Sequence, residues 1–358
     1  MGVSRFTLLP LLLTVSSFLL HLSAAEMTGS FKCGGGRSAT CSSLVGFAPQ
    51  NATTLGDLQA LFSARDLQSI LAANDLPLST PRNQRWSANQ TIRIPIPCSC
   101  SNGTGISNRV PTYTVKVGDT LSGISSVVFR GLVQFQSIGD VNGIKDVDVI
   151  EVGQRLWIPL PCSCDKVDGE DVVHYAHVVE PGSSVEKIAA QFGTDNATLL
   201  RLNGISGDSE LLANYAFDVP LRVCSSSVRN DSLDSPMLVV NGSYTITANN
   251  CVKCSCNASR NWTLSCEPSQ LKPANWQTCP SMQCQGQKSL LIGNTTSSSC
   301  GPRSCAYAGF SNQTIFTTLS PDSCPGSRSG NHGSRFHSDW KFSVVSVQLV
   351  LLCLHLLW

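Results

Sequence analysis

The chain of 358 residues has a formal net charge of +1, and only 14% of its residues are charged. This balance lacks the basic surface that binding to nucleic acid or to an acidic lipid surface requires. A neutral polymer remains compatible as a ligand.

Residues 1–25 predict a secretion signal that is removed from the mature chain. Arg5 gives a basic start, residues 6–22 are apolar, and residues 23–25 offer a small-residue cleavage site. A membrane anchor is the alternative, but the apolar run is too short and too early for a stable span. We expect the mature chain to begin at Glu26.

Secretion places the cysteines in an oxidising compartment, where they favour disulfides. The chain has 17 cysteines, and Cys353 lies in a terminal tail that we expect to be lost, so the other sixteen can all pair. Asn-x-Ser/Thr sequons predict a glycosylated extracellular surface. They lie at Asn51, Asn89, Asn102, Asn196, Asn230, Asn241, Asn257, Asn261, Asn294 and Asn312.

The first recognisable segment after the signal is helical. Residues 57–73 are rich in apolar side chains at helical spacing. Asn51-Ala52-Thr53-Thr54-Leu55 precedes them, and the sequence IPIPCSC closes the segment at residues 94–100.

Residues 113–159 predict a strand, two helices and a second strand. Tyr113, Val115 and Val117 alternate with polar residues, and Gly118-Asp119-Thr120 then supplies a turn and a helix start. A second helix is predicted over residues 132–140 and ends near Gly143. A short strand is predicted over residues 156–158. The apolar positions of the first helix are Leu121, Ile124, Val127 and Val128.

The pattern repeats along the chain. IPIPCSC at residues 94–100 returns as IPLPCSC at residues 158–164, and Val-Pro-Leu at 219–221 is followed by Cys224. An Asn-initiated triplet precedes each of these exits, at residues 74–76, 142–144 and 203–205. The third copy has Gly-Ser-Ser-Val at residues 182–185 as its turn and a second helix with Leu199, Leu200 and Leu202 inward. The first copy departs most from the pattern.

These motifs resemble the lysin motif, LysM, a module that recognises N-acetylglucosamine polymers. The resemblance rests on YTVKVGDTLSGI from Tyr113, the Asn142-Gly143-Ile144 step and the closing LWIP at residues 156–159. It implies an α+β fold of three tandem βααβ modules tied by disulfides and followed by a Cys-rich loop and β region. The predicted domains are a signal peptide at 1–25, a degenerate first module at 26–100, a second module at 112–160, a third module at 175–222, a Cys-rich region at 224–326 and an attachment propeptide at 330–358.

The two Cys-Ser-Cys linkers predict bonds between modules, because cysteines separated by one residue do not easily bond to each other. Six cysteines allow 15 pairings. The resemblance to plant LysM receptor ectodomains implies Cys33 with Cys100, Cys41 with Cys164 and Cys98 with Cys162. The alternative is that both linkers hold one zinc ion, which a secreted chain disfavours.

In LysM modules, the loop after the first strand and the loop before the second strand grip the sugar. Backbone N–H and C=O groups there can pair with acetamido groups, and we expect Leu121, Ile150 and Val152 to cover methyl and ring faces. The alternative is that Gly118, Asp119 and Thr120 serve only as turn and N-cap. In the second module the implied carbohydrate-binding residues are Val117, Gly118, Asp119, Thr120, Leu121, Ser122, Gly123, Val149, Ile150, Glu151, Val152, Gly153, Gln154 and Arg155.

The third module is the predicted secondary site. There Asn214 replaces Gly153 and Pro181 replaces Val117, which weakens the match. Trp157 is interpreted as a packing residue of the closing strand rather than as a sugar-stacking platform. The implied secondary residues are Gly182, Ser183, Ser184, Leu212, Ala213 and Asn214.

Catalysis has one candidate cluster between the second and third modules. Paired carboxylates are what glycosidases need, but this segment contains glycine and has no large domain around it, so a solvated linker is favoured. The sequence predicts no catalytic residue, no cofactor and no metal. The cluster comprises Asp165, Asp168, Glu170, Asp171, His174 and His177.

The downstream third predicts a disulfide-held β region, because ten cysteines from Cys224 to Cys324 allow five bridges whose pairing stays open. Residues 342–358 form an apolar run that follows a polar spacer and small residues. This predicts a GPI-attachment signal with Ser329 as attachment residue, Gly330 and Asn331 being the alternatives. A single transmembrane span lacks the length and the cytoplasmic residues.

The whole arrangement resembles plant LysM-domain GPI-anchored pattern-recognition proteins. The resemblance implies a non-enzymatic receptor on the extracellular face of the plasma membrane that binds chitin oligosaccharides or peptidoglycan fragments and triggers innate immunity. Its implied partners are a transmembrane LysM receptor-like kinase and related LysM proteins in homo- or hetero-oligomers. The alternatives are a wall-directed glycosidase and a symbiotic sensor of lipo-chitooligosaccharides.

Overall fold

The computed structural model describes residues 31–34, 40–298 and 301–320. Its architecture is α+β, as the sequence predicts. The secretion signal, the C-terminal attachment signal with Ser329, and Cys300, Cys324 and Cys353 lie outside the described residues. Within the described ranges, no helix has the length and apolar character needed to cross a membrane.

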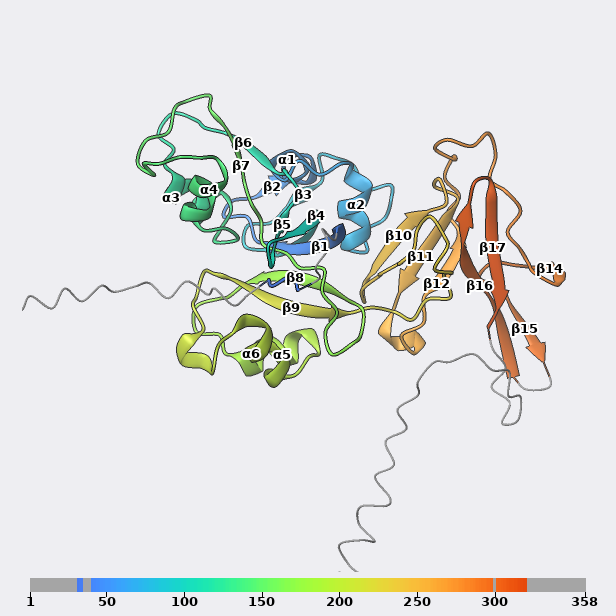
Figure 1. Ribbon diagram of the computed structural model, residues 1–358. Coiled ribbons are helices and arrows are strands. Elements are labelled where there is room, and N and C mark those ends of the chain that lie inside the picture. The colour runs from blue at the N-terminus through green and yellow to red at the C-terminus, as the bar shows by residue number, and fades with distance from the viewer. Residues whose placement is uncertain (1–30, 35–39, 299–300, 321–358) are drawn as a thin grey trace, which may run out of the picture.

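A five-stranded sheet joins the first module to the third (Figure 1). The first strands of the two modules run parallel and place Leu44 beside Tyr175 and Val45 beside Ala176. All other pairings in this sheet are antiparallel. The sheet order is β5 (Thr104–Ser107), β4 (Ile92–Ser101), β1 (Thr40–Phe47), β8 (Val172–Val178) and β9 (Ala216–Arg222).

In the first module, the helical stretch predicted over residues 57–73 is divided into α1 (Leu55–Leu61) and α2 (Leu67–Ala73). Asp66 causes the division, because its carboxylate accepts a hydrogen bond from the Ser69 amide at 2.8 Å and so caps a new helix. The short strands β2 (Thr53–Thr54) and β3 (Arg85–Trp86) pair with each other outside the main sheet.

The second module has its own two-stranded sheet of β6 (Thr112–Thr114) and β7 (Arg155–Trp157). Its helices are α3 (Leu121–Gly123), the π-helix η1 (Ile124–Val128) and α4 (Phe135–Val141), which begins later than predicted. The wider π turn buries Ser125 and Phe129 and leaves Val127 56% exposed. The predicted place of Val127 on the apolar helix face is therefore wrong.

Aromatic rings connect the cores of the first two modules. Phe62 of the first module meets Phe47 at 5.0 Å and Phe129 of the second at 5.9 Å, both edge to face. Phe129 in turn meets Tyr113 at 6.2 Å. Such contacts add to the burial of large side chains, so one hydrophobic cluster spans both modules. The first module thus shares its sheet with the third module and its core with the second.

The third module places α5 (Val185–Phe192), α6 (Asn196–Asn203) and the 3₁₀ helix η2 (Asp208–Glu210) between β8 and β9. Ser184 and Asp195 cap the two helices through side-chain oxygens. Leu199 is fully buried, as predicted, and packs in a separate cluster with Phe217 and Val219.

The repeated asparagine has the same structural role in all three modules. Its amide donates to the second helix and to the closing strand, and its carbonyl accepts a strand N–H. Asn74 does so with Ile70 and Arg93, Asn142 with Ile138 and Trp157, and Asn203 with Leu199 and Asp218, over 2.7–2.9 Å. A buried amide satisfied in this way fixes the end of the helix against the sheet.

The downstream region is built from antiparallel strands and lies beside the first module (Figure 1). Tyr244 donates its hydroxyl to the Leu76 carbonyl at 2.7 Å and so ties β10 (Ser243–Thr247) to the end of α2. The other elements are β11 (Val252–Cys256), η3 (Ala258–Arg260), β12 (Ser265–Pro268), β13 (Gln283–Cys284), β14 (Gln287–Leu291), β15 (Thr295–Ser298), β16 (Gly301–Ser311) and β17 (Thr314–Leu319). Its described disulfides are Cys224–Cys256, Cys251–Cys279, Cys254–Cys266 and Cys284–Cys305.

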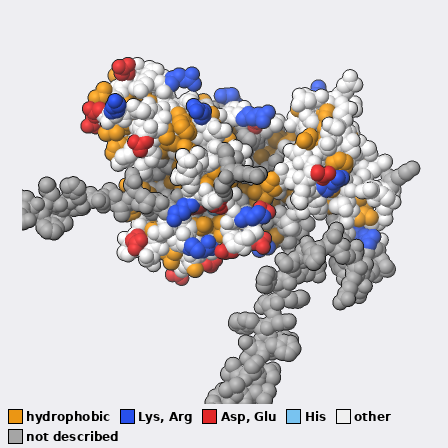
Figure 2. Space-filling model, viewed as in Figure 1, with side chains coloured by type: hydrophobic (Ala, Val, Ile, Leu, Met, Phe, Trp, Pro, Cys, Tyr) orange, Lys and Arg blue, Asp and Glu red, His pale blue; other side chains and the backbone are white. Residues whose placement is uncertain are grey.

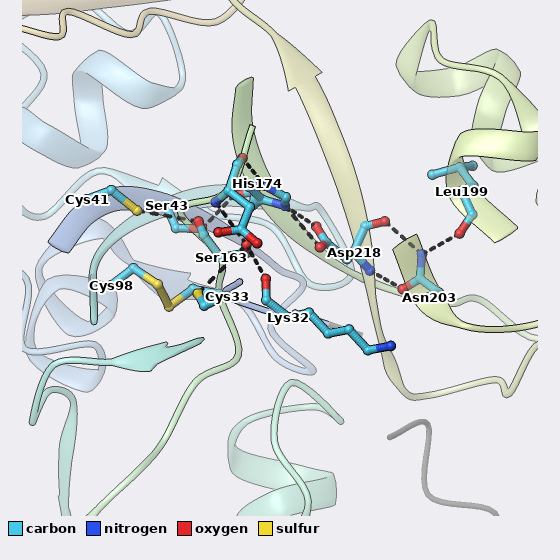
Figure 3. Close-up of polar contacts among 12 residues, drawn as sticks. Lys32, Cys33, Cys41, Ser43, Cys98, Ser163, His174, Leu199, Asn203 and Asp218 are labelled. Atoms are coloured by element: carbon cyan, nitrogen blue, oxygen red, sulfur yellow. Dashed lines mark hydrogen bonds and ion pairs between the residues drawn. A yellow bond between two sulfur atoms is a disulfide. The ribbon is translucent and has the colours of Figure 1, made fainter. Parts of the chain in front are cut away.

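Three further disulfides hold the modules together, and they are the pairs that the resemblance implies: Cys33–Cys100, Cys41–Cys164 and Cys98–Cys162. Cys41 and Cys98 are direct neighbours across β1 and β4. Each nevertheless bonds to the second linker, so the linker is attached to the sheet at two points. The linker's Ser163 also donates a hydrogen bond to the Lys32 carbonyl at 2.8 Å (Figure 3).

Next to this linker, a buried ion pair lies inside the shared sheet (Figure 3). His174 Nδ1 is 2.8 Å from a carboxylate oxygen of Asp218, and its Nε2 is 2.9 Å from the Asp165 carbonyl oxygen. Burial alone would lower the pKa of His174, but the Asp218 carboxylate and the Asp165 carbonyl raise it above its usual 6.5. Both ring nitrogens face acceptors, so the folded chain favours the imidazolium. His177 has no such acceptor among the residues that the structure describes, and burial lowers its pKa to about 4.

We predict that Asp218→Asn destabilises the protein most below about pH 6.5. A raised folded-state pKa contributes stability that is complete below the unfolded pKa and is lost as the pH rises through the folded pKa. The loss at low pH should reach about 3 kcal/mol, because an unpaired buried charge remains. Chemical unfolding at a series of pH values measures it.

His177→Phe serves as the matched control with the opposite sign. Its folded pKa is lowered, so wild-type His177 stabilises the protein above its unfolded pKa and ceases to do so as the pH falls. The variant should therefore gain relative stability in acid. A loss for Asp218→Asn that does not depend on pH would contradict the ion pair.

Candidate functional site

Each module brings its two candidate loops together through one equivalent hydrogen bond. The amide of Gly153 donates to the Val115 carbonyl at 2.8 Å in the second module. Asn89 donates to Pro49 at 2.7 Å in the first, and Asn214 to Val179 at 2.8 Å in the third. These contacts align the three modules residue by residue. We call the two loops that each bond joins the loop pair of that module.

In the second module the loop pair comprises residues 117–123 and 149–155. The largest exposed apolar side chains of these loops are Val117 at 88%, Val149 at 64% and Val152 at 65%. Gly118 and Gly153 have φ of 87° and 88°, and a Cβ on either would meet no atom within 4 Å. The loop pair is therefore open on the side where these residues lie. Figure 2 shows apolar side chains on this part of the surface, at the upper left.

The polar residues of the loop pair mainly shape it. The Asp119 carboxylate accepts hydrogen bonds from the Tyr113 hydroxyl at 2.8 Å and from the Lys116 amide at 2.7 Å. Burial and the bond to Asp119 raise the pKa of Tyr113 to about 12. Thr120 caps the helix by accepting from the Gly123 amide at 3.0 Å. These contacts agree with the turn and N-cap alternative for Asp119 and Thr120.

The remaining predicted residues divide between the surface and the interior. Ser122 and Glu151 are exposed, and Gln154 Oε1 accepts from the Glu151 amide at 3.1 Å. Arg155 reaches Thr112, and Ile150 packs partly against the core. The Leu121 side chain is fully buried. The prediction that it covers a ligand face is therefore wrong, because it fills the core beneath the loop.

The three modules differ most clearly in the hydrogen bonding of the backbone amide at the start of the first helix. In the first module the Leu55 amide donates to the Gln84 carbonyl at 3.0 Å, and in the third the Val185 amide donates to the Asp208 carboxylate at 2.7 Å. Leu121 is the equivalent residue of the second module. Among the described residues, no acceptor takes its amide N–H. The second module thus leaves this amide without a protein acceptor in the described ranges, although the residue itself is fully buried.

In the first module, backbone pairing between two short strands, a ladder, closes the loop pair. β2 pairs with β3 so that Thr53 faces Trp86 and Thr54 faces Arg85. The equivalent residues of the second module, 119–120 and 149–150, form no such ladder. Backbone groups that pair across the loops are unavailable to a ligand.

The third module's loop pair is partly covered by its neighbour. A Cβ on Gly131 of the second module would lie 2.1 Å from the Asn214 carbonyl oxygen, so the two modules meet there. Asn214 holds a φ of 65° where the second module has Gly153. Asparagine tolerates this left-handed conformation, so the loop keeps its shape. Gly182 also keeps a positive φ, Ser183 and Leu212 are half-buried, and Ala213 is exposed.

Comparison with known proteins identifies the family. The model of the LysM domain matches residues 113–159 and 177–214. The chain is 58% identical over 361 residues to the LysM domain-containing GPI-anchored protein 2 of Arabidopsis thaliana, with 100% of both chains covered.

The chain belongs to the LysM domain-containing GPI-anchored proteins. Other members are the chitin elicitor-binding protein of Oryza sativa subsp. japonica, 39% identical over 92% of each chain, and the rice protein LYP4, 38% identical over 81% of this chain and 74% of that one. As in its family, the chain is held on the extracellular face of the plasma membrane by a GPI anchor.

Several side chains of the candidate catalytic cluster of this LysM protein are engaged in internal contacts. Asp168 pairs with Arg201 at 2.8 Å and Asp171 with Lys166 at 2.9 Å. His174 is buried in its ion pair. The sulfurs of Cys41, Cys98 and Cys164 lie within 4.8 Å of one another, but each is in a disulfide, which leaves no thiolate for a metal.

Sequence reasoning missed one cleft of the LysM protein. It measures about 1000 Å³ and lies between the third module and the Cys-rich region, with Asp195, Arg222 and Trp262 among its lining residues. The Arg222 guanidinium stacks 4.4 Å from the Trp262 ring centre. No motif spacing in the sequence could have predicted this cleft, because its walls come from segments that are far apart in the chain.

We predict that hydrogen exchange distinguishes the three helix-start amides. Leu121 is buried but its N–H has no acceptor among the described residues, so it should exchange faster than the equivalent Leu55 and Val185, whose amides are hydrogen-bonded. NMR or mass spectrometry at residue resolution measures the rates. Equal protection at all three positions would show that the second loop pair is closed like the others.

Proposed function

We propose that this LysM protein is a non-enzymatic receptor that binds N-acetylglucosamine polymers through the loop pair of its second module. The observation that carries the proposal is the open loop pair, which exposes Val117, Val149 and Val152 and, unlike that of the first module, forms no ladder. The name of the rice relative, chitin elicitor-binding protein, supports this ligand class.

The chemistry of the loop pair suits this sugar. An acetamido group offers one carbonyl acceptor and one N–H donor, which can pair with backbone N–H and C=O groups of loops that form no ladder with each other. Val117, Val149 and Val152 offer apolar surface to the acetyl methyl and to the ring faces. No charged side chain is needed, because the polymer is neutral. Chitin oligosaccharides and peptidoglycan fragments both present this sugar.

Signalling requires a partner in this proposal. A GPI anchor ends in the outer leaflet, so a bound sugar can act inside the cell only through a protein that crosses the membrane. We propose a transmembrane LysM receptor-like kinase as this partner and innate immunity as the outcome. Related LysM proteins are further candidates for homo- or hetero-oligomers.

The decisive experiment titrates the purified ectodomain with chitin oligosaccharides and with peptidoglycan fragments by calorimetry. We expect Val152→Asp to weaken binding at least about tenfold, because a charge replaces apolar contact area. Leu233→Asp is the matched control, since Leu233 is 68% exposed but lies in the Cys-rich region. Equal effects of the two variants would move the site off the second module.

The alternatives give different outcomes in the same assays. A wall-directed glycosidase would release soluble sugar from chitin over time, whereas the receptor leaves the polymer intact. A sensor of lipo-chitooligosaccharides would prefer the acylated oligomer in competition with chitin oligosaccharides and peptidoglycan fragments. Sustained release of sugar would overturn the non-enzymatic proposal.

A further inference from the structure

Both loops of the first module's loop pair carry a glycosylation sequon. Asn51-Ala52-Thr53 lies in the first loop and Asn89-Gln90-Thr91 in the second. The bond from the Asn89 amide to the Pro49 carbonyl is equivalent to the bond from Gly153 to Val115. Asn89 therefore stands where the second module has Gly153, and Asn51 stands where it has Val117.

Both asparagines are available for modification. Each side chain is exposed, and within the described part of the chain neither side-chain amide has a hydrogen-bond partner. Asn89 holds a φ of 58°, which asparagine tolerates. Some other sequon asparagines have structural duties: Asn241 accepts from the Ala258 amide at 2.8 Å, and Asn257 caps η3.

The second module shows the opposite pattern. None of the sequons lies between Asn102 and Asn196. Of the six large apolar side chains that are most exposed among the described residues, this stretch holds four, namely Val117, Val127, Val149 and Val152. A bulky, hydrated glycan keeps other macromolecules away from the surface around it. The second module, which exposes apolar side chains, thus contains no sequon, whereas the first module, whose loops are closed, carries one in each loop.

We propose that N-linked glycans on Asn51 and Asn89 cover the loop pair of the first module and confine oligosaccharide binding to the second. The inference rests on the proposed function. In the secretory pathway, each asparagine Nδ2 displaces a polyprenyl diphosphate from C1 of a lipid-linked oligosaccharide. The new C–N bond replaces an N–H bond of the amide, and the proton leaves with the diphosphate.

The first test does not depend on sugar binding. Glycopeptide mass spectrometry of the full chain released from plant membranes should find Asn51 and Asn89 occupied. In Asn51→Gln/Asn89→Gln, oxidation of Trp86 by hydroxyl radicals should rise at least about twofold, because Trp86 lies on the ladder between the two glycans. Asn312→Gln, which removes a sequon in the turn after β16, should leave Trp86 unchanged.

The second test transfers the sequon to the second module. Gly153→Asn/Arg155→Thr creates Asn-Gln-Thr, the sequence of residues 89–91. The glycosylated variant should bind chitin oligosaccharides at least about tenfold more weakly than Gly153→Asn/Arg155→Ala, which has the same asparagine but no sequon. Enzymatic removal of the glycan should restore binding to the level of Gly153→Asn/Arg155→Ala.

Each outcome decides one claim. Unmodified Asn51 or Asn89, or Trp86 oxidation that is the same with and without the glycans, overturns the inference even if the ectodomain binds chitin oligosaccharides. A glycosylated Gly153→Asn/Arg155→Thr that binds as well as its alanine counterpart also overturns it. A wild-type ectodomain that binds neither chitin nor peptidoglycan refutes only the proposed function. The glycopeptide and Trp86 oxidation results then decide whether glycans cover the first module.

Discussion

The attachment of the second Cys-Ser-Cys linker to the central sheet is the constraint on which the structure depends. Cys98 and Cys41 sit side by side on neighbouring strands, and each bonds to a different cysteine of that linker. The two bonds span 64 and 123 residues of sequence. Closing loops of this length stabilises a fold by about 4 kcal/mol per bond in the chain-entropy view. Modules this small bury little apolar surface and depend on such bonds.

The first and second modules have different roles in this arrangement. The first module shares a sheet with the third and an aromatic core with the second, so its position fixes both neighbours. Its own loops are paired by a ladder, which removes their backbone groups from ligand contact. The second module has its own small sheet, and its two loops form no ladder. The module least like the family pattern therefore organises the fold, while the module most like it presents the candidate site.

Local chemistry made much of this predictable. The Asn triplets, the Gly turns and the Thr or Ser caps occur at regular spacing, so they can be recognised in the sequence. Thr120, which caps its helix, and Asn142, which bonds to the closing strand, are examples. The parallel pairing of Val45 with Ala176 and the ladder at Thr53 join segments far apart in sequence, where no periodicity reports them. The exposure of Val127 depends on one π turn, and the burial of Leu121 on the core beneath it. The pairing of the downstream cysteines could not be predicted, because the number and spacing of cysteines do not determine which of them form disulfides.

The most direct test of the account is an NMR titration of the isotope-labelled ectodomain with a chitin oligosaccharide. If the second module holds the open site, the amide signals of Gly118, Leu121 and Gly153 shift together with a single affinity. The equivalent amide signals of the first and third modules, Leu55 and Val185, then stay in place. Shifts centred on those modules, or on the cleft beside Trp262, would contradict the claim that the second module holds the open site.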